Sequence, residues 1–441
     1  MGKFSISSAR WIAFEILRKV ADGDFSSALL AAEEPNLEPV DRGLCHELVL
    51  GVLRWQLNLD KVIEHYAARK TASLDRSVLI ALRLGLYQLR FLTRVPASAA
   101  VNESVKLVHA ARLSSARSFV NAVLRRATRE PDYDPGSTEE DPVSKLSITT
   151  SHPRWMIERW IGAIGLEAAE AFARANNETP PVAFRIVRAK GNPKELLDKL
   201  RAVGIDLEPS AVVQGAWRVS GSTGELRSLA QSGAIYLQDE ASQLVAELVE
   251  AQANDFVLDL CAAPGGKTTM IADREPESHV LACDVSARRL SIVARAVAVQ
   301  QLKNVWLFRL DGSKALPFQP GSFDRVLVDA PCSGTGTLRH NPEIRWRLAE
   351  ADLGRLSIQQ VALLQNAAEV LKPGGRLIYS TCSVEREENE DVVAEFLRRN
   401  DQMRLVPLRG NRDLTTSSGT LRTWPQRHGT DGFFVAAFKK I

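Results

Sequence analysis

The stretch FVLDLCAAPGGKTTMIAD, residues 256–273, joins an apolar strand to a helix through a turn with two adjacent glycines. Its first residues are the Phe, Val and Leu of a buried strand, and KTTMIAD continues as a helix. Gly265 and Gly266 allow the backbone to come close to a ligand where the helix begins. Strand, glycine turn and helix in this order are typical of a doubly wound α/β sheet.

Strands and helices continue to alternate after this unit. Apolar strands are expected at HVLACD, VWLFRLD, FDRVLVDAP and RLIYSTC, with a late strand at GFFVAAFKK. The segments SARRLSIVARAVAVQ, RLSIQQVALLQNAAEVL and NEDVVAEFLRR have helical periodicity. This alternation predicts a parallel sheet with helices on both faces, from residue 233 to residue 441.

The N-terminal part of the chain has a different pattern. RWIAFEILRKV and RSVLIALRLGLYQLRFL space their apolar residues helically, which predicts an all-helical bundle over residues 1–135. Residues 1–130 carry 19 Lys and Arg against 13 Asp and Glu, whereas the whole chain has a net charge of +3. This excess suits a polyanion such as RNA, but a solvated helical surface explains it equally well.

The connection between these two parts suggests a third. EPDYDPGSTEEDPVS, residues 130–144, is acidic and rich in Pro and Gly, and is expected to be a linker. SHPRWMIERWIGAIG predicts a further helix, and VAFRIVRAK, KELLDKLRAVGI and AWRVS predict a small strand–helix–strand unit within residues 145–232. A division into three parts agrees with the length of 441 residues, because a chain of this length is too long to fold around a single hydrophobic core.

Other features exclude several classes of protein. The five cysteines show no CxxC spacing, and no paired histidines occur, so neither a disulfide framework nor a metal site is expected. MGKFSISSARWIAFEILRKV has charges among its apolar positions, which favours an amphipathic helix over a signal peptide. No segment approaches the roughly 18 apolar residues of a membrane span. We expect a cytoplasmic protein with reduced thiols, for which a monomer is sufficient.

Acidic residues end four successive strands: Asp259, Asp284, Asp311 and Asp329. Ligands of doubly wound sheets bind at the carboxyl ends of the strands, where Asp284 could accept the hydroxyls of a ribose. Asp311 could accept the exocyclic amine of an adenine. We interpret this set as a site for S-adenosylmethionine, whose sulfonium and ammonium groups suit carboxylates. The alternative is that each Asp only caps a turn or a helix.

Two other nucleotide-binding motifs are incomplete in this region. The dinucleotide fingerprint G-x-G-x-x-G is absent. Gly266, Lys267 and Thr268 match the end of a phosphate-binding loop, but Cys261 stands where that loop requires its first glycine. A phosphate cradle is therefore not favoured.

Cys332 and Cys382 follow two of these strands, in DAPCSG and STCSVE. Methyltransferases that act on amino groups carry an aromatic residue at the end of such a turn, so a thiol there points to methylation of carbon. A thiolate that adds to C6 of cytosine makes C5 nucleophilic enough to accept a methyl group. Asp329 could supply an acid near N3, and Lys267 could lower the pKa of a thiol or orient the base.

The alternative for these two cysteines is that they are small buried hydrophobic residues. We expect that role for Cys45 and Cys283, which stand in an apolar helix and an apolar strand. Cys261 is expected to pack close to the cofactor.

Several longer motifs carry a family resemblance. DLCAAPGGKTT, DVSARRL, VLVDAPCSGTGTLRHNPEIRW, LKPGGRLIYSTCSVEREENEDVV and DGFFVAAFKK resemble the motifs of the NOL1/NOP2/Sun RNA cytosine-5 methyltransferases. GVLRWQLNLDKVI, LRLGLYQLRF and FVNAVLRR resemble a NusB-like RNA-binding domain. The resemblance implies a class I (Rossmann-like) S-adenosylmethionine-dependent methyltransferase domain after a NusB-like helical domain and a small α/β segment.

The resemblance also implies roles for individual residues. Cys382 would be the nucleophile, and Cys332 would assist proton removal and product release. DNA cytosine-5 methyltransferases use the cysteine of their Pro-Cys turn as nucleophile, so residue types alone leave this order open. The residues implied to bind S-adenosylmethionine are Cys261, Ala262, Ala263, Pro264, Gly265, Gly266, Lys267, Asp284, Asp311 and Asp329.

The implied substrate is a specific cytidine of 16S small-subunit ribosomal RNA, unpaired or flipped out of its helix. Alternatives are the same chemistry on transfer RNA or on another ribosomal site, and a non-catalytic RNA-binding or assembly factor. In GTLRHNPEIRWR, residues 336–347, we expect Arg339, His340, Arg345 and Arg347 to bind phosphates and Trp346 to stack on a base. A solvated loop with a buried Trp is the other interpretation.

Overall fold

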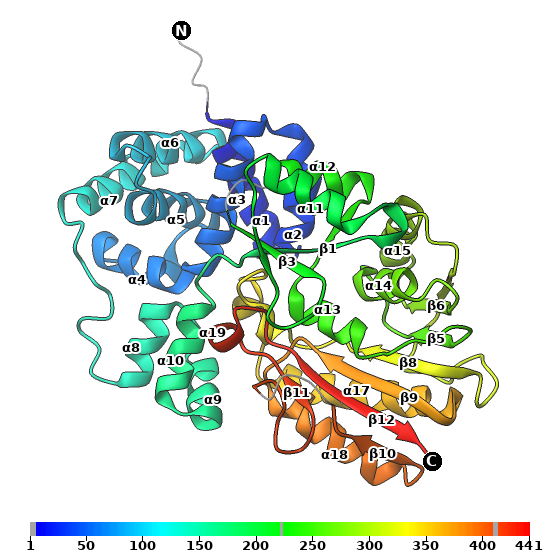
Figure 1. The fold of residues 1–441 in the computed structure, drawn as a ribbon. Coiled ribbons are helices and arrows are strands. Elements are labelled where there is room, and N and C mark those ends of the chain that lie inside the picture. Colours follow the sequence, from blue (N-terminus) through cyan, green and yellow to red (C-terminus); the bar gives the residue numbers. More distant parts are fainter. Residues whose placement is uncertain (1–5, 221–223, 409–412) are drawn as a thin grey trace. The chain divides into compact units, whose positions relative to one another are not determined.

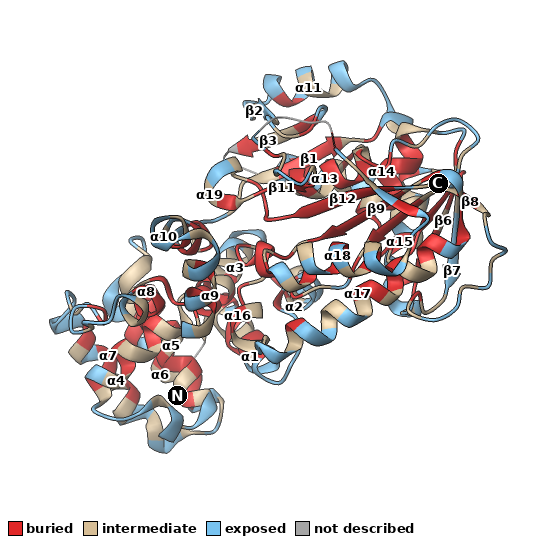
Figure 2. Cartoon of the chain, turned by 90° about the horizontal axis from the view of Figure 1, so that it is seen from below, coloured by how far each residue is buried: buried red, intermediate tan, exposed pale blue. Residues whose placement is uncertain are grey.

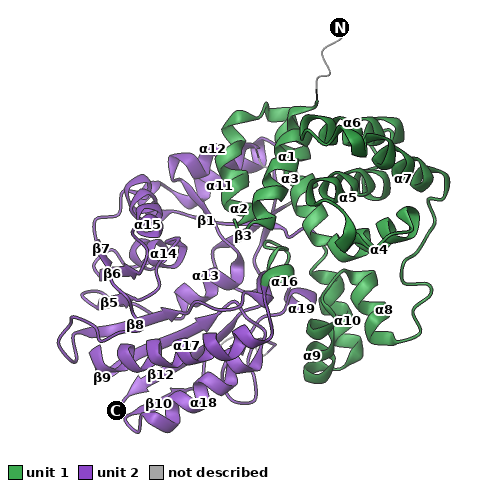
Figure 3. Cartoon of the chain, turned by 180° about the vertical axis from the view of Figure 1, so that it is seen from behind, with its two compact units in different colours: residues 1–178, 338–347 green, residues 179–337, 348–441 purple. Residues whose placement is uncertain are grey.

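The chain forms two compact units in the computed structural model, which describes residues 6–220, 224–408 and 413–441 (Figures 1 and 3). Unit 1 comprises Met1–Glu178 and Leu338–Arg347, and unit 2 comprises Thr179–Thr337 and Leu348–Ile441. The chain therefore leaves unit 2 after Thr337, contributes ten residues to unit 1, and returns at Leu348.

Unit 1 is built of helices around one apolar core. Its first seven helices are α1 (Ser8–Ala21), α2 (Ser26–Glu33), α3 (Pro39–Arg54), α4 (Gln56–Ala67), α5 (Arg76–Phe91), α6 (Ala97–Ala110) and α7 (Arg117–Arg129). Phe14, Ile63 and Leu84 lie in the core that these helices share. The helical periodicity of the sequence is confirmed, because its apolar positions are the ones that the core buries.

Four shorter helices complete unit 1: α8 (Pro142–Thr150), α9 (Arg154–Ile164), α10 (Leu166–Ala175) and α16 (Ile344–Arg347). The segment expected as a linker begins by packing on the helices. Tyr133 stacks on His65 with ring centroids 3.7 Å apart, and Arg90 donates a hydrogen bond to the carbonyl of Tyr133.

Unit 2 begins with a small antiparallel sheet of order β2-β3-β1-β4. Its elements are β1 (Val182–Ile186), α11 (Pro193–Ala202), β2 (Asp206–Pro209), β3 (Ala216–Ser220), α12 (Gly224–Ser232) and β4 (Ile235–Leu237). The sequence predicted β1, α11 and β3, but not β2 and β4, which have four and three residues, or the polar helix α12. Arg185 on β1 is buried and donates hydrogen bonds to Thr269 and Gln300 of the following domain.

The large sheet of unit 2 has the order β10-β12-β9-β8-β5-β6-β7, with β11 beside β12. Its strands are β5 (Phe256–Asp259), β6 (His279–Asp284), β7 (Val305–Arg309), β8 (Phe323–Asp329), β9 (Leu371–Thr381), β10 (Met403–Val406), β11 (Leu421–Arg422) and β12 (Phe434–Lys440). Five neighbouring strands, β9, β8, β5, β6 and β7, are parallel to one another. β12 pairs with β9 antiparallel. The sheet is thus mixed rather than wholly parallel, because the C-terminal strand inserts between β9 and β10.

Helices cover both faces of this sheet (Figure 2). They are α13 (Glu240–Glu247), α14 (Gly266–Arg274), α15 (Ala287–Gln300), α17 (Ala351–Val370) and α18 (Glu390–Arg399), with α19 (Pro425–His428) in the C-terminal part. Leu258 and Val328 pack in the core that contains α17 and α18, whereas their neighbours Val257 and Leu327 pack with α13 and α14. Successive side chains of a strand point to opposite faces, so continuous apolar runs are needed here. Within the described ranges, no helix has the length and apolarity that crossing a bilayer requires.

Candidate active site

The turns after β8 and β9 bring two thiols together. The two strands are adjacent and parallel, and Asp329 is in register with Ser380. Cys332 follows this register position by three residues and Cys382 by two, so both lie just beyond the same edge of the sheet. The sulfur atoms of Cys332 and Cys382 lie 3.3 Å apart, and both cysteines are free and half-buried. The sequence predicted both positions, and the topology explains their proximity.

Asp329 and Lys267 form an ion pair beside these thiols. Nζ of Lys267 lies 2.7 Å from Oδ2 of Asp329, and the Ser380 hydroxyl donates to Oδ1 of Asp329 at 2.7 Å. Burial disfavours the Lys267 ammonium, but the charge and hydrogen bond of Asp329 outweigh burial and raise the pKa of Lys267. The thiolate charge of Cys382 contributes to the same rise in pKa. Lys267 is therefore a permanent cation that faces both a carboxylate and a thiol.

A buried carboxylate, that of Glu388, accepts hydrogen bonds from both of the turns that carry the cysteines. It accepts hydrogen bonds from the backbone N–H of Ser333 at 2.8 Å and from the Ser333 hydroxyl at 2.5 Å. It also accepts from the Ser383 hydroxyl at 2.5 Å and from Nε2 of Gln360 at 2.9 Å. Ser333 follows Cys332 and Ser383 follows Cys382, so one side chain fixes both turns.

Glu388 is not among the residues predicted from the sequence. It lies in VEREENE, where Glu385, Glu387 and Glu390 surround it, and no local signal distinguishes it from them. Glu388 is completely buried, and its partners Ser333 and Gln360 come from segments distant in the chain.

The environment of Cys332 keeps its proton in place. The hydrogen bond with Cys382, then burial, and then the charges of Cys382, Glu388 and Asp329 raise the pKa of the Cys332 thiol well above its usual range. These surroundings disfavour the thiolate form of Cys332.

Gly336 holds the loop that follows Cys332 close to Cys382. Its N–H donates to the carbonyl of Cys382 at 2.9 Å, and its carbonyl accepts from the N–H of Gly432 at 2.8 Å. A Cβ at this position would lie 2.0 Å from the carbonyl oxygen of Gly432. Only glycine allows this approach, which the sequence analysis did not anticipate.

A pocket of about 130 Å³ lies at the carboxyl end of β5, beside Asp329 and Lys267. Its walls include Tyr236, Gln238, Asp259, Cys261, Ala262, Ala263, Pro264 and Gly266. A Cβ on Gly266 would lie 3.1 Å from the ring of Tyr236 and 3.2 Å from the amide of Gln238, so glycine keeps this wall open. Gly265 adopts a φ of +106° at the start of α14, a conformation that glycine reaches without strain.

The four strand-end aspartates have different environments. Asp259 is buried and accepts a hydrogen bond from Thr268 at 2.6 Å, and burial raises its pKa to about 7. Asp284 is also buried, accepts from the N–H of Ser286 and pairs with Arg289 at 3.5 Å.

Asp311 is partly exposed and accepts hydrogen bonds from the backbone N–H and the hydroxyl of Ser313, which lower its pKa. Of the four, Asp259 and Asp329 line the pocket at β5. The local hydrogen bonds of Asp284 and Asp311 are those of turn-capping residues, and the second oxygen of each carboxylate pairs with a nearby cation, Arg289 or Lys314.

These residues fit S-adenosylmethionine in chemical type. Carboxylates at neighbouring strand ends suit a ligand with a sulfonium and an ammonium group, and the open wall at Gly266 admits a backbone contact. No cluster of phosphate-binding cations lines the pocket at β5, where Lys267 is already paired with Asp329.

The segment that follows the Cys332 loop corrects one expectation. Arg345 is 1% exposed in unit 1 and does not face solvent. Its guanidinium donates to the carbonyls of Arg54, Ser151 and Asn176 and to Oδ1 of Asn177, at 2.7 to 3.2 Å. Arg345 is therefore a structural residue of unit 1 and not a phosphate ligand.

Its neighbours are held in unit 1 as well. Arg339 is buried, with its carbonyl bonded to Arg54 at 3.2 Å. Nε1 of Trp346 donates to the carbonyl of Leu53 at 2.7 Å, and Arg347 donates to the carbonyls of Val20 and Asp24. The expected grip of this segment on phosphates is thus wrong for Arg339 and Arg345.

Comparisons with known proteins agree with the order of the domains. Family models match the NusB family over residues 7–129, the RsmF/B-like ferredoxin-like domain over residues 152–223, and the 16S rRNA methyltransferase RsmB/F over residues 246–439. Ribosomal RNA small subunit methyltransferase B of Pseudomonas putida is 34% identical over 441 residues, with 98% of each chain covered.

The chain belongs to the ribosomal RNA small subunit methyltransferase B family. Another member of the methyltransferase B family, from Pasteurella multocida, is 33% identical over 450 residues, covering 98% of this chain and 96% of its own. The crystal structure of PH0851 matches with a TM-score of 0.85 and 30% identity over the full length of both chains. NSun6 from Pyrococcus horikoshii with SFG covers 65% of this chain and 98% of its own, with a TM-score of 0.60 and 22% identity, and shows a shared fold.

Membership of the methyltransferase B family confirms the resemblance on which the sequence analysis relied. It also confirms the multidomain architecture, a NusB-like helical domain followed by a ferredoxin-like segment and a methyltransferase domain. The coarser part of the predicted function, methylation of ribosomal RNA, follows from this membership.

Proposed function

We propose that this member of the methyltransferase B family transfers the methyl group of S-adenosylmethionine to C5 of an unpaired cytidine in 16S ribosomal RNA, through a covalent bond between Cys382 and C6. The observation that carries this proposal is the pair of thiols 3.3 Å apart at adjacent strand ends, beside the Lys267–Asp329 ion pair. Methylation of a phosphate-bound sugar or an amino group needs neither thiol.

The first step is the attack of the Cys382 thiolate on C6 of the base. A hydrogen bond from the Cys332 thiol stabilises this thiolate, and Lys267 lies near enough for its charge to be coupled to Cys382. The electron pair of the C5–C6 double bond moves toward C5 and the N3 side of the ring, where a proton held by the Asp329–Lys267 pair reduces the developing charge. Bound S-adenosylmethionine supplies the electrophilic methyl group that C5 then accepts.

The second step removes the proton from C5 and releases the product. Once Cys382 is bonded to carbon, Cys332 no longer faces a thiolate, and the largest cause of its raised pKa is gone. Cys332 can then lose its proton to solvent and accept the proton of C5. The electron pair of the C5–H bond restores the C5–C6 double bond and expels the Cys382 thiolate. The two cysteines return to their starting protonation states, and one proton has been released overall.

We assign the remaining roles from chemistry and position. Cys261, Ala262, Ala263, Pro264, Gly265, Gly266, Lys267, Asp284, Asp311 and Asp329 hold the cofactor, and Asp259 extends this set. Residues 1–135 and 145–232 contact the RNA, and residues 233–441 carry the chemistry in a protein that acts as a monomer.

The test uses Cys332→Ala and Cys382→Ala proteins with S-adenosylmethionine and small-subunit ribosomal RNA. Cys332→Ala is expected to accumulate an RNA–protein adduct that survives denaturing electrophoresis, because methylation proceeds and release does not. Cys382→Ala is expected to give neither adduct nor 5-methylcytosine.

Two other outcomes would change the proposal. The reverse pattern would keep the chemistry and exchange the two cysteines. Absence of methyl transfer by the unmodified protein to any ribosomal or transfer RNA would leave a non-catalytic binding or assembly factor.

A further inference from the structure

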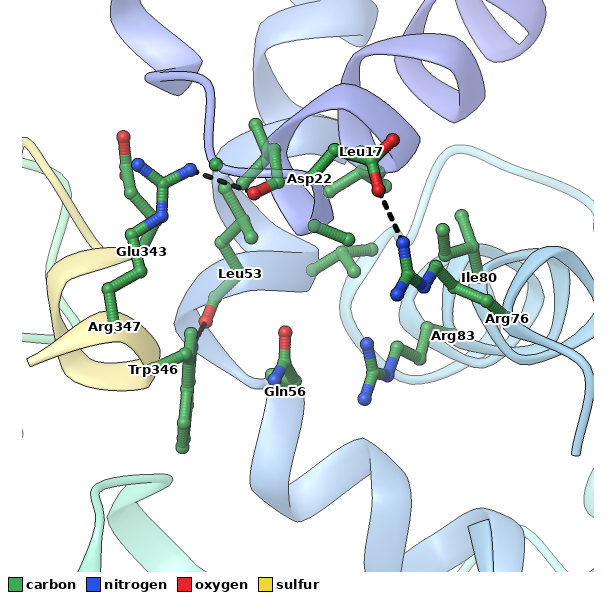
Figure 4. A pocket seen from close by; sticks show the side chains of 14 residues that line it. Leu17, Asp22, Leu53, Gln56, Arg76, Ile80, Arg83, Glu343, Trp346 and Arg347 are labelled. Atoms are coloured by element: carbon green, nitrogen blue, oxygen red, sulfur yellow. Dashed lines mark hydrogen bonds and ion pairs between the residues drawn. The ribbon is translucent and has the colours of Figure 1, made fainter. Parts of the chain in front are cut away.

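Unit 1 contains a pocket that the proposed chemistry does not use (Figure 4). Its volume is about 390 Å³, within the range of small-molecule sites. The walls come from α1, the ends of α3 and α4, α5 and the short helix α16. The inserted residues 338–347 therefore create one side of this pocket.

The side made by α16 presents an aromatic surface. Figure 4 shows the indole of Trp346 edge-on, with its face turned toward the side where Gln56 and Arg83 lie. The hydrogen bond from Nε1 to the carbonyl of Leu53 fixes the ring, so little side-chain entropy is lost when a ligand stacks on it. Leu17, Leu53 and Ile80 add apolar surface.

Two further polar side chains, Gln56 and Glu343, line the pocket. The carboxamide of Gln56 lines the pocket and can donate and accept hydrogen bonds. Oε1 of Glu343 accepts from the N–H and hydroxyl of Ser26, at 2.9 and 2.8 Å. Oε2 of Glu343 is buried and has no partner, and Glu343 is 1% exposed. Glu343 therefore serves the packing of α16 against Ser26, and Gln56 is the polar group on the side that the indole faces.

Three arginines, Arg76, Arg83 and Arg347, line the pocket. Arg76 is 62% exposed and pairs with Asp22, while Arg83 pairs with Asp60 through two bonds of 2.7 Å. Arg347 is set against the carbonyls of Val20 and Asp24 and keeps further N–H groups. A guanidinium bound to carbonyl oxygens retains its full charge, which suits a phosphate.

We propose that this pocket binds one unpaired nucleotide of the RNA substrate, with its base on Trp346, its edge toward Gln56, and its phosphate toward one of the arginines that line the pocket. The inference rests on the proposed function, because it takes the substrate to be RNA. It adds a second RNA-binding site, in unit 1, to the site of the cysteines in unit 2. Proteins commonly bind unstacked bases by stacking them on an aromatic side chain, with cationic side chains nearby for the phosphates.

The test uses the full chain and a ten-nucleotide single-stranded RNA that contains 4-thiouridine. Ultraviolet cross-linking without S-adenosylmethionine, followed by mass spectrometry, is expected to find the RNA on the peptide that contains Trp346. In fluorescence anisotropy, Trp346→Ala is expected to weaken binding by roughly tenfold, the effect of losing one stacked base. Trp346→Phe keeps an aromatic face and is expected to lose about threefold or less.

Trp306→Ala is the matched control, because Trp306 is 50% exposed on β7 in unit 2 and lies outside the pocket. Gln56→Ala tests the polar side without changing the indole. The inference is overturned if Trp346→Ala binds the RNA like the unmodified protein, or if Phe and Ala weaken binding equally. Adenosine monophosphate that binds at micromolar concentration while the RNA does not compete would mean a free nucleotide and would also overturn it.

Failure of this inference and failure of the proposed function give different results. Cross-linking at Trp346 requires no methyl transfer, so it would stand if the protein proved to be a binding factor. Conversely, 5-methylcytosine formation with cross-links only in unit 2 would support the proposed function and reject this pocket.

Discussion

Residues 329–337 and 338–347 are continuous in the sequence and equally rich in polar side chains, but they belong to different units. In the first region, hydroxyls and Glu388 bond to one another and leave two thiols half-exposed. In the second, Arg345 is buried in unit 1 and donates hydrogen bonds to backbone carbonyls. The comparison teaches that a charged residue beside a reactive site indicates function only when the packing leaves it accessible.

The largest effect is expected from removing the buried guanidinium. Arg345→Met leaves the carbonyls of Arg54, Ser151 and Asn176 without donors, which should cost unit 1 about 3–5 kcal/mol of stability. Urea unfolding measures this loss. Arg355→Ala is the control, because Arg355 has a 68% exposed side chain and its loss should stay within about 0.5 kcal/mol. Equal stability of both variants would show that Arg345 is not a structural residue.

The next effect concerns Asp259. It is as deeply buried as Arg345, but it lies at the carboxyl end of β5 in unit 2. Its folded pKa of about 7 lies above its ordinary value, so its stability contribution is complete below pH 4 and is lost as the pH rises toward 7. Asp259→Asn should remove this pH dependence and gain on the order of 2–4 kcal/mol at pH 8. The measurement compares the unfolding free energies of the unmodified protein and Asp259→Asn from pH 4 to pH 8. An unchanged slope would contradict the raised pKa.

Glu388 tests whether the polar network serves activity more than stability. Glu388→Gln keeps the shape but loses charged hydrogen bonds to Ser333 and Ser383, so the two cysteine turns should become less well positioned. We expect kcat for methyl transfer to fall by about 100-fold while KM for RNA changes little. Glu369→Gln, at an exposed position of α17, is the control. A rise in KM alone would assign Glu388 to RNA binding.

The smallest effect probes the coupling of the thiols. Because the hydrogen bond with Cys382 is the largest cause of the raised pKa of Cys332, Cys382→Ala should lower that pKa. Alkylation of Cys332 by iodoacetamide at pH 8 should then become roughly tenfold faster, as followed by mass spectrometry. Cys283, fully buried on β6, provides the internal control. Slower alkylation would mean that Cys382 activates Cys332, which would favour the exchanged roles.

Much of the fold could be predicted because it depends on local pattern. Helical periodicity in residues 1–135 and apolar runs near Val257, Val326 and Ile378 reflect which face of each element is buried. The weak points were the antiparallel β12 and the short strands β2 and β4, where pairing partners rather than composition decide the structure.

For the site, the sequence by itself determined the chemistry that is available. Asp329 ends a strand, Cys332 and Cys382 follow strands, Lys267 begins the helix after the glycine turn, and parallel strands end at one edge. Only the tertiary structure decided which residues support them. Glu388 became the link between the two turns, and Arg345 became part of the interior of unit 1. The physical reason is that burial and hydrogen-bond partners arise from segments distant in the chain, and these determine whether a charge meets solvent, substrate or protein.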